Sequence, residues 1–333
     1  MKFDILLTDL KNKIYKPIYL LHGEEEYFIN IISDYIEDHI LDEAEREFNQ
    51  TVMYGKDVDA GTIIDTARRY PMMSNYQVVI VKEAQALADI EELKSYAEKP
   101  FDTTILVLCH KHKAFDSRKS LHKIIDKTGV VFKSNRLYDN QLPAWINNQV
   151  KAEGYSITPE AAQLLSANLG SNLSKIRMEL EKLFISLDKN SVINEDAIEE
   201  NIGISKDFNI FELQKALGAG DVVKANLIIK HFGANPKANP FVLTTALLYQ
   251  FFAKLLIYHK IKDKSKDNTV AAELSTSPYF VRDYRNAAKR FSLQKSIQAV
   301  SLLREYDLKF KGVNNVSADE GELLKELVFK LMH

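Results

Sequence analysis

Cysteine and tryptophan are the scarcest side chains in this 333-residue sequence, since each occurs once. One cysteine excludes a disulfide framework and a metal site made of several thiolates, and it fits a reducing compartment. Hydrophobic residues make up 46% of the chain, which excludes a disordered or collagen-like protein. The length predicts two or three domains, because single hydrophobic cores stop growing near ~250–300 residues.

The sequence also lacks a targeting segment and a long uncharged apolar run. Its N-terminal residues, MKFDILLTDLKNK, contain neither the apolar core nor the cleavage site of a signal peptide. The longest apolar stretch, from Pro240 to Tyr258, is interrupted by Gln250 and Lys254. A membrane-spanning helix needs about 20 nearly uncharged residues. We therefore expect a cytoplasmic protein with no membrane partner.

Net charge is nearly absent, because 44 Lys and Arg residues offset 46 Asp and Glu residues to leave −2. The charges are nevertheless segregated along the chain. Residues 1–60 contain 14 acidic and 6 basic side chains, whereas residues 251–300 contain 4 acidic and 10 basic ones. The balanced total argues against a general nucleic-acid coat, but the basic segment leaves a local contact with phosphate groups open.

Short apolar runs alternate with helical patterns over residues 1–135. The runs predict strands at Pro17–His22, Phe48–Tyr54, Gln77–Val81, Thr104–Cys109 and Gly129–Phe132. Continuous Val, Ile and Leu are typical of parallel strands that are covered on both faces. Apolar stripes between them predict helices at Glu25–Leu41, Asp59–Tyr70, Ile90–Lys99 and Ser117–Lys127. This alternation predicts a doubly wound α/β domain.

From Asp139 onward the strand signal stops and helical patterns follow one another. Thr158-Pro159-Glu160 combines an N-cap residue, a proline at the first helical position and an acid in the first turn. Helices are predicted at Glu160–Asn168, Leu173–Leu187, Glu195–Glu200, Ile210–Leu217, Asp221–Phe232, Pro240–Ile261, Tyr279–Arg290, Leu293–Lys311 and Glu320–Met332. We thus predict an α/β domain over residues 1–138, a small helical domain over 139–204 and an all-helical domain over 205–333.

The turn after the first predicted strand stands where a P-loop protein holds phosphate, yet it lacks the residues for that task. A working loop reads GxxxxGK[ST], in which glycine amides, a lysine and a hydroxyl hold the phosphates and Mg²⁺. The residues in its place are Gly23, Glu24, Glu25 and Glu26. We expect the three carboxylates on the first helical turn to occupy the place of an anion and to repel a triphosphate.

No other arrangement predicts catalysis or metal binding. The strand that would carry a magnesium ligand ends in Lys82-Glu83, which places a cation beside its one acid. Cys109 closes an apolar strand and is predicted to be a buried structural thiol. His110 and His112 alternate with lysines that would repel a metal ion, which favours a solvated loop. We therefore expect no catalytic residue, no metal and no cofactor.

One apolar element lies next to a polar turn. Tyr70-Pro71-Met72-Met73 joins a predicted helix to the third predicted strand, and Pro71 ends the helix. Two adjacent thioethers could adapt to a hydrophobic pocket on a partner. The alternative is that both side chains cap the core of the sheet, and the sequence alone favours that alternative.

A basic face follows in the C-terminal third of the chain. Arg282, Arg285 and Lys289 have the spacing of one helix face, with Arg290 nearby. A solvated surface explains such a set, and contact with DNA phosphates or with a neighbouring subunit is the alternative.

Four segments in a fixed order resemble a known family. The run Leu169–Leu183, LGSNLSKIRMELEKL, is similar to the signature G-(N/S)-(D/N)-L-x-x-(I/L)-x-x-E-(L/I)-x-K-L. Tyr19–Glu25, Phe208–Leu213 and Gly220-Asp221 match the same family in the same order. The family is the bacterial DNA polymerase III delta subunit, and the resemblance spans almost the whole chain.

The resemblance implies a non-catalytic clamp-loader subunit that binds and opens the sliding clamp during DNA replication. Its fold would be an AAA+-like domain with a degenerate phosphate loop, a small lid-like domain and an all-α collar. The implied partners are the sliding clamp (beta subunit), the tau/gamma and delta-prime subunits, and primed DNA within the complex. The family's clamp contact is typically Leu-Phe, and it corresponds here to Met72 and Met73 in the segment from Tyr70.

Two alternatives belong to other classes. A divergent AAA+ ATPase would use Gly23 and Glu83, and it predicts binding of Mg·ATP. A DNA-binding helical scaffold would use the basic segment, and it predicts duplex binding that weakens steeply with salt.

Overall fold

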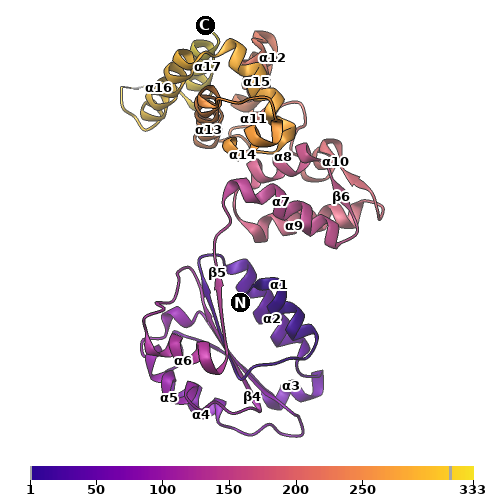
Figure 1. Ribbon diagram of the computed structural model, residues 1–333, viewed down its shortest axis with the longest axis vertical. Helices are drawn as coiled ribbons and strands as arrows, with labels where there is room; N and C mark the ends of the chain where they lie inside the picture. Colours follow the sequence, from indigo (N-terminus) through magenta and orange to yellow (C-terminus); the bar gives the residue numbers. More distant parts are fainter. Residues whose placement is uncertain (1, 315–316) are drawn as a thin grey trace. The chain divides into compact units, whose positions relative to one another are not determined.

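The computed structural model describes residues 2–314 and 317–333. Within it the chain forms two compact units, residues 1–137 and residues 138–333, and each is described by itself (Figure 1).

A five-stranded parallel sheet is the centre of the first unit. The sheet has the order β2-β3-β4-β1-β5. Its strands are β1 (Ile18–Gly23), β2 (Gln50–Tyr54), β3 (Gln77–Lys82), β4 (Thr104–His110) and β5 (Val130–Ser134). The helices of the unit are α1 (Phe3–Lys11), α2 (Glu26–His39), α3 (Glu43–Asn49), α4 (Ala60–Ala67), α5 (Lys94–Ala97) and α6 (Ser120–Thr128), with 3₁₀ turns at Ala84–Ala86 and Ile90–Leu93.

Alternate residues of each central strand pack against helices on opposite faces of the sheet. Tyr19 and Leu21 of β1 belong to the core shared with α1 and α2. Ile18 and Leu20 belong to the core shared with α4, α5 and α6, which cover the other face (Figure 1). Strands covered on both faces need an apolar residue at every position, which explains the continuous runs in the sequence. The predicted doubly wound α/β domain is confirmed.

Some predicted boundaries in the first unit were wrong. The chain forms α1 and α3, which were not predicted, and α3 takes Phe48 and Asn49 from the predicted second strand. The predicted helix Ile90–Lys99 is a 3₁₀ turn followed by the short α5. The predicted helix Asp59–Tyr70 ends at Ala67, so Tyr70 lies in the loop before β3.

The second unit is mainly helical. It begins with a 3₁₀ turn at Asp139–Gln141 and includes another at Pro278–Phe280. Its helices are α7 (Leu142–Ala152), α8 (Pro159–Leu169), α9 (Leu173–Ser186), α10 (Glu195–Ile202), α11 (Ile210–Ala219), α12 (Val222–Ala234), α13 (Phe241–Lys260), α14 (Asp267–Leu274), α15 (Val281–Arg290), α16 (Leu293–Phe310) and α17 (Glu320–Met332). Two strands that were not predicted, β6 (Ser156–Ile157) and β7 (Val192–Ile193), form a short parallel pair.

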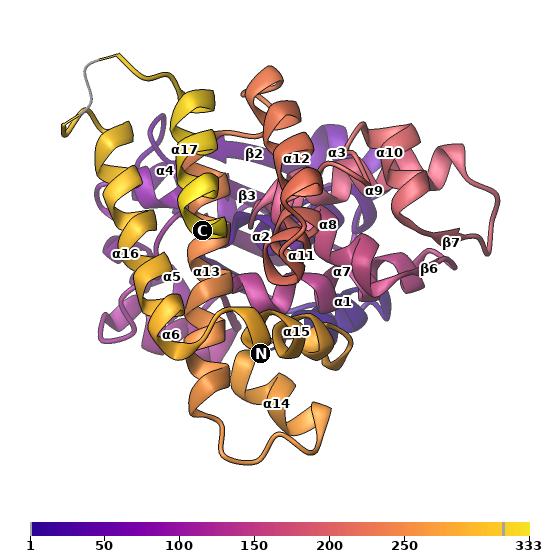
Figure 2. The ribbon, with the colours of Figure 1, turned by 90° about the horizontal axis from the view of Figure 1, so that it is seen from above.

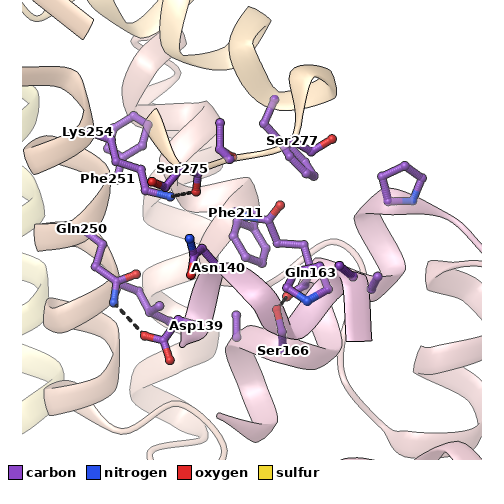
Figure 3. A pocket seen from close by; sticks show the side chains of 18 of the residues that line it. Asp139, Asn140, Gln163, Ser166, Phe211, Gln250, Phe251, Lys254, Ser275 and Ser277 are labelled. Carbon is purple, nitrogen blue, oxygen red and sulfur yellow. Dashed lines mark hydrogen bonds between the residues drawn. The ribbon is translucent and has the colours of Figure 1, made fainter. Parts of the chain in front are cut away.

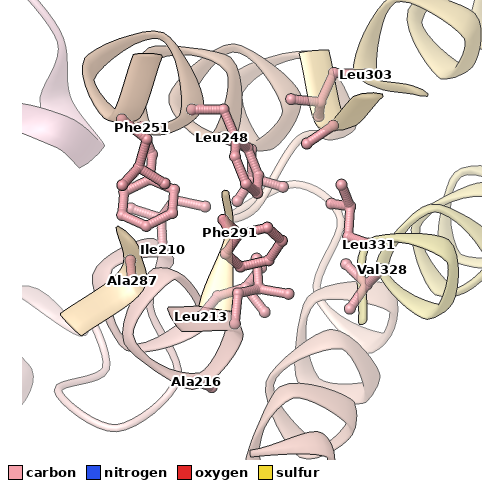
Figure 4. Close-up of a cluster of buried hydrophobic side chains, with 14 of the residues drawn as sticks. Ile210, Leu213, Ala216, Leu248, Phe251, Ala287, Phe291, Leu303, Val328 and Leu331 are labelled. Atoms are coloured by element: carbon pink, nitrogen blue, oxygen red, sulfur yellow. The ribbon is translucent and has the colours of Figure 1, made fainter. Parts of the chain in front are cut away.

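One hydrophobic cluster connects α11 to α17. Figure 4 shows residues of this cluster from several of these helices, with Leu213, Leu248 and Phe291 at the centre of the view. The helix α13 packs against α16, and α12 packs against α17, as Figure 2 shows from above. The predicted all-helical stretch from residue 205 is therefore present, whereas α7 and α14 were not predicted.

The apolar helix α13 is long and apolar enough, by length and composition alone, to cross a membrane. An 18-residue window within it has a mean hydropathy of 1.6, and 44% of that window is buried in the structure. Leu248, Phe252 and Leu255 of this helix lie in the hydrophobic cluster. Burial within the helical core accounts for the apolar residues on one face of α13.

Candidate functional site

The backbone of Ser134, at the end of β5, fills the space beside the turn from β1 to α2. Gly23, the last residue of β1, has a φ of 142°, and a Cβ on it would lie 1.9 Å from the carbonyl oxygen of Ser134. The same oxygen accepts the backbone amides of Glu24 at 3.0 Å and Glu25 at 3.5 Å. The strand β5 therefore uses amides that a phosphate loop would direct toward an anion.

The carboxylate of Glu25 caps α2. Its Oε1 accepts the backbone amide of Tyr27 at 3.1 Å, and the hydroxyl of Ser134 donates to its backbone carbonyl. Burial raises the pKa of Glu25 above its usual value. The helix begins at Glu26, so Glu25 is the N-cap and Glu24 precedes it. The expectation that three carboxylates share the first helical turn was wrong: Glu26 alone lies there, and the buried Glu25 fills the anion position.

The acid that follows β3 is held in ion pairs. Glu83 lies 3.2 Å from Lys111 and 3.6 Å from His112, while Lys82 pairs with Glu37 at 2.8 Å. Burial would raise the pKa of Glu83, but hydrogen bonds and ion pairs outweigh burial and lower it. The structure thus gives Glu83 a role in connecting β3 to the segment after β4.

Cys109 and His110, which the sequence offered as candidates for a reactive thiol and a zinc ligand, are buried in the first unit. Burial raises the pKa of Cys109 to about 11, so the thiol is inert at neutral pH. His110 is buried and its Nδ1 lies 3.1 Å from the carbonyl oxygen of Lys113. Over residues 2–314 and 317–333, no three His, Cys, Asp or Glu side chains are grouped so that they could hold a metal ion.

Met72 and Met73 are exposed on the loop between α4 and β3. Met72 is 62% exposed and Met73 is 102% exposed, so neither thioether belongs to the core of the sheet. Tyr70 is also exposed and its ring lies against that of Phe101, with 5.7 Å between the centroids. The loop therefore presents two unbranched apolar side chains to solvent.

Asn49, which the sequence did not identify, fixes this loop. Its side-chain nitrogen donates to the carbonyl oxygen of Met72 at 3.0 Å, and its oxygen accepts the amide of Met72 at 2.6 Å. Met73 then adopts a left-handed conformation, with φ at 54°. Asn49 lies 23 residues before Met72, so no local sequence pattern indicates the contact.

The methionine pair and the degenerate phosphate loop lie at opposite ends of the parallel strands. Met72 and Met73 precede the amino end of β3, whereas Gly23 ends β1 at its carboxyl end. Because β3, β4 and β1 are parallel neighbours, the two loops are separated by the length of the strands. A partner could contact the methionines without approaching Gly23.

Two basic side chains on α15 bond to other elements of the second unit, and two are exposed to solvent. Arg285 forms an ion pair with Asp267, and Arg290 donates to the carbonyl oxygen of Met332. Arg282 and Lys289 are exposed, and the ammonium of Lys289 lies 3.3 Å from the side-chain oxygen of Asn286. Two of the four predicted contact residues are thus committed to holding the second unit together.

A cavity of about 860 Å³ in the second unit, with a lining of mixed polar and apolar side chains, was not predicted from the sequence. It is lined by residues of α7, α8, α11, α13 and α14 (Figure 3). The ammonium of Lys254 donates to the carbonyl oxygen of Ser275 at 3.2 Å, and Gln250 donates to Asp139 at 3.5 Å. Burial lowers the pKa of Lys254. These contacts connect α13 to the start of the unit and to the end of α14.

Two family models match the chain, one in each unit. The model described as "DNA polymerase III, delta subunit" matches residues 19–135. The model described as "DNA polymerase III delta subunit, C-terminal domain" matches residues 207–329. The chain belongs to the DNA polymerase III delta subunit family. The resemblance found in the sequence is confirmed.

Two relatives of this delta subunit match over most of their length. The DNA polymerase III subunit delta of Bacillus subtilis (strain 168) is 24% identical over 322 residues, which cover 93% of this chain and 92% of the relative. The probable DNA polymerase III subunit delta of Aquifex aeolicus (strain VF5) is 20% identical, with 94% of this chain and 83% of the relative covered.

A solved structure has the same fold. The Bacillus subtilis DNA clamp loader delta protein matches with a TM-score of 0.56 and 22% identity, and the match covers 99% of each chain. The predicted combination of a doubly wound α/β domain with a helical C-terminal region is thereby confirmed.

Proposed function

We propose that this delta subunit binds and opens the sliding clamp, and that Met72 and Met73 are the clamp contact. The observation that supports the proposal is the exposure of both thioethers on a loop whose backbone is fixed. Family membership supports it as well, because the solved Bacillus subtilis structure with the same fold is named a DNA clamp loader delta protein. Tyr70 and Pro71 complete the contact segment.

Hydrophobic burial would supply the affinity. Moving one large apolar side chain out of water contributes about 1.5–3 kcal/mol, so a pair could account for most of a micromolar interaction. Met-Met in place of Leu-Phe gives flexible, unbranched side chains that suit an irregular pocket. Opening the clamp requires no chemistry from the subunit, since higher affinity for the open ring than for the closed one shifts that equilibrium.

The subunit would act without ATP chemistry of its own. Ser134 and Glu25 already satisfy the amides of Glu24, Glu25 and Tyr27 at the start of α2, which supports a non-catalytic role. ATP hydrolysis would then belong to the tau/gamma subunits. We further propose that residues 139–204 form the lid-like domain and residues 205–333 the collar that meets the tau/gamma and delta-prime subunits, in the bacterial cytoplasm.

The deciding experiment compares clamp binding by the full chain and by a Met72→Ala/Met73→Ala variant. Met178 on α9 provides a matched control, because it is 61% exposed and lies in the second unit. We expect the double variant to bind the clamp of the same organism about 10²- to 10⁴-fold more weakly, since two buried apolar side chains contribute about 3–6 kcal/mol. Met178→Ala should bind like the wild type.

Two results would count against this function. Unchanged clamp binding by the double variant would remove the methionine assignment. Absence of binding by the wild-type chain, at clamp concentrations well above micromolar, would remove the clamp-binding function itself.

Contact with primed DNA within the complex is a second, subsidiary proposal. It is favoured by the exposure of Arg282 and Lys289 on α15. If both touch phosphates, the Arg282→Ala/Lys289→Ala variant assembled into the loader should reduce the slope of log affinity against log salt by about 2. An unchanged slope would assign the basic face to solvent or to a neighbouring subunit.

A further inference from the structure

Asn49 is buried at the junction of α3 and β2 and bonds to the backbone of the methionine loop. Its side chain is 2% exposed, although amide side chains are usually found at the surface. The Nδ2 atom donates to the carbonyl oxygens of Glu45 and Met72, each at 3.0 Å. The Oδ1 atom accepts the amide of Met72 at 2.6 Å. One side chain therefore joins the last turn of α3 to the loop.

This pairing satisfies both backbone groups of Met72 at once. A carboxamide carries a donor and an acceptor side by side, so it can replace the neighbouring strand that would otherwise pair with such a peptide. No other side chain of the same length offers both groups. Loss of either bond would leave a buried polar atom without its partner, which costs more than the bond itself contributes.

The conformation of Met73 makes a fixed neighbour necessary. Its φ of 54° lies in the left-handed region, which is unfavourable for a residue with a Cβ. Such a conformation persists when the surrounding structure holds it. Asn49 holds the residue before Met73, and the hydroxyl of Ser74 accepts the amide of Tyr76 at 3.3 Å on the other side.

We propose that Asn49 is a positioning residue that holds the methionine pair in its binding conformation before the clamp arrives. This inference rests on the proposed clamp-binding function. Binding through a loose loop would have to order that loop, and the lost conformational freedom would be subtracted from the affinity. A loop that is already ordered avoids this loss and directs both thioethers away from the sheet.

The test uses the full chain with Asn49→Ala and Asn49→Asp. Alanine removes all three bonds, and aspartate keeps an acceptor for the Met72 amide but places oxygen against two carbonyl groups. We expect clamp affinity to fall about 10-fold in each variant, as the cost of ordering a few side chains and backbone groups implies. Asn168→Ala is the control, since Asn168 donates to the carbonyl oxygen four residues earlier on α8 at 2.8 Å. It should leave clamp affinity unchanged.

A double-mutant cycle separates positioning from general damage to the fold. In a Met72→Ala/Met73→Ala background, Asn49→Ala should cause almost no further loss, because the side chains that it positions are gone. Hydrogen exchange adds a readout in the wild-type chain, where the Met72 amide should be protected. In both Asn49 variants we expect that protection to fall while β1 and β4 stay protected.

The outcomes distinguish the clamp contact through Met72 and Met73 from the positioning role of Asn49. If the methionine double variant binds like the wild type, the methionine assignment fails whatever Asn49 does, and if the wild-type chain does not bind the clamp, the clamp-binding function fails. If that variant is weak but both Asn49 variants bind like the wild type, the positioning role is overturned. Equal losses from Asn49→Ala in both backgrounds, or a rapidly exchanging Met72 amide in the wild type, would overturn it as well.

Discussion

The carbonyl oxygen of Ser134 lies so close to Gly23 that a Cβ on Gly23 would be 1.9 Å from it. Ser134 ends β5 and Gly23 ends the neighbouring strand β1, so the contact lies at the carboxyl ends of these two parallel strands. In a functional phosphate loop this space belongs to an anion, and here it belongs to backbone. A glycine is required at this position because the backbones of the two chain segments meet there.

Gly23→Ala should therefore destabilise the first unit by about 3 kcal/mol, since overpacking and an unfavourable φ act together. Gly61→Ala on α4 is the control in the same unit, because its Cβ would lie 3.4 Å from the nearest atom in ordinary contact. Alanine in a helix should stabilise that unit by about 0.5–1 kcal/mol. The single tryptophan, Trp145, lies in α7 of the second unit, so hydrogen exchange of β1 in urea is the suitable measurement. Equal effects of the two substitutions would contradict the contact.

Mg·ATP should not stabilise the purified chain. The amides of Glu24, Glu25 and Tyr27 already have acceptors, and the carboxylate of Glu25 occupies the start of α2. A ligand bound at 100 times its Kd would add about 2.7 kcal/mol to the free energy of unfolding, which is readily detected as a rise in Tm. We expect no rise at millimolar Mg·ATP. A rise that Glu25→Ala enhances would favour the divergent ATPase instead.

The parts of the fold that the sequence predicts are those with a repeated apolar signal. The strands β1, β3 and β4 are apolar at consecutive positions because helices cover both faces. The helix α3 has no such signal, since Asn49 is its only buried residue. A capping box formed by Asp42 and Glu45 begins it, and that pattern is visible in the sequence.

The candidate site was only partly predictable for a different reason. Two adjacent methionines before a strand fit a core position or an exposed one, and the sequence alone favoured the core. The observed exposure of Met72 and Met73 depends on tertiary structure. Asn49 lies 23 residues from its partner, and Ser134 lies 109 residues from Glu25. Contacts over such separations leave no spacing that a single sequence reveals.

Acidification should weaken the first unit through His22. Burial lowers the pKa of this imidazole from 6.5 to about 4, and its Nδ1 accepts the amide of Phe115 at 3.0 Å. The unfolded chain binds a proton near pH 6.5 and the folded chain does not until about pH 4. Stability is thus lost as the pH falls between these values, by about 2 kcal/mol at pH 4.5.

His22→Asn tests this pH dependence, because the shorter amide keeps an acceptor near the Phe115 amide and does not titrate. The variant should be less stable than the wild type at pH 7, and the difference should shrink by about 2 kcal/mol at pH 4.5. The exposed His39 gives a surface control, whose Asn variant should retain the wild-type loss on acidification. Parallel stability curves for wild type and His22→Asn between pH 7 and pH 4.5 would contradict the assignment.

Arg290 and Lys289 are neighbours on α15 and should respond differently to truncation. The guanidinium of Arg290 donates to the carbonyl oxygen of Met332 at the end of α17 and packs over Gly220, which has a φ of 75° at the end of α11. Arg290→Ala should destabilise the second unit by about 1–2 kcal/mol, since a hydrogen bond from a charged group and the packing of its stem are both lost. Lys289→Ala removes an exposed side chain and should change stability by less than about 0.5 kcal/mol. Urea unfolding followed by Trp145 fluorescence reports this unit directly. Equal stability of the two variants would return Arg290 to the set of free basic side chains that could contact DNA.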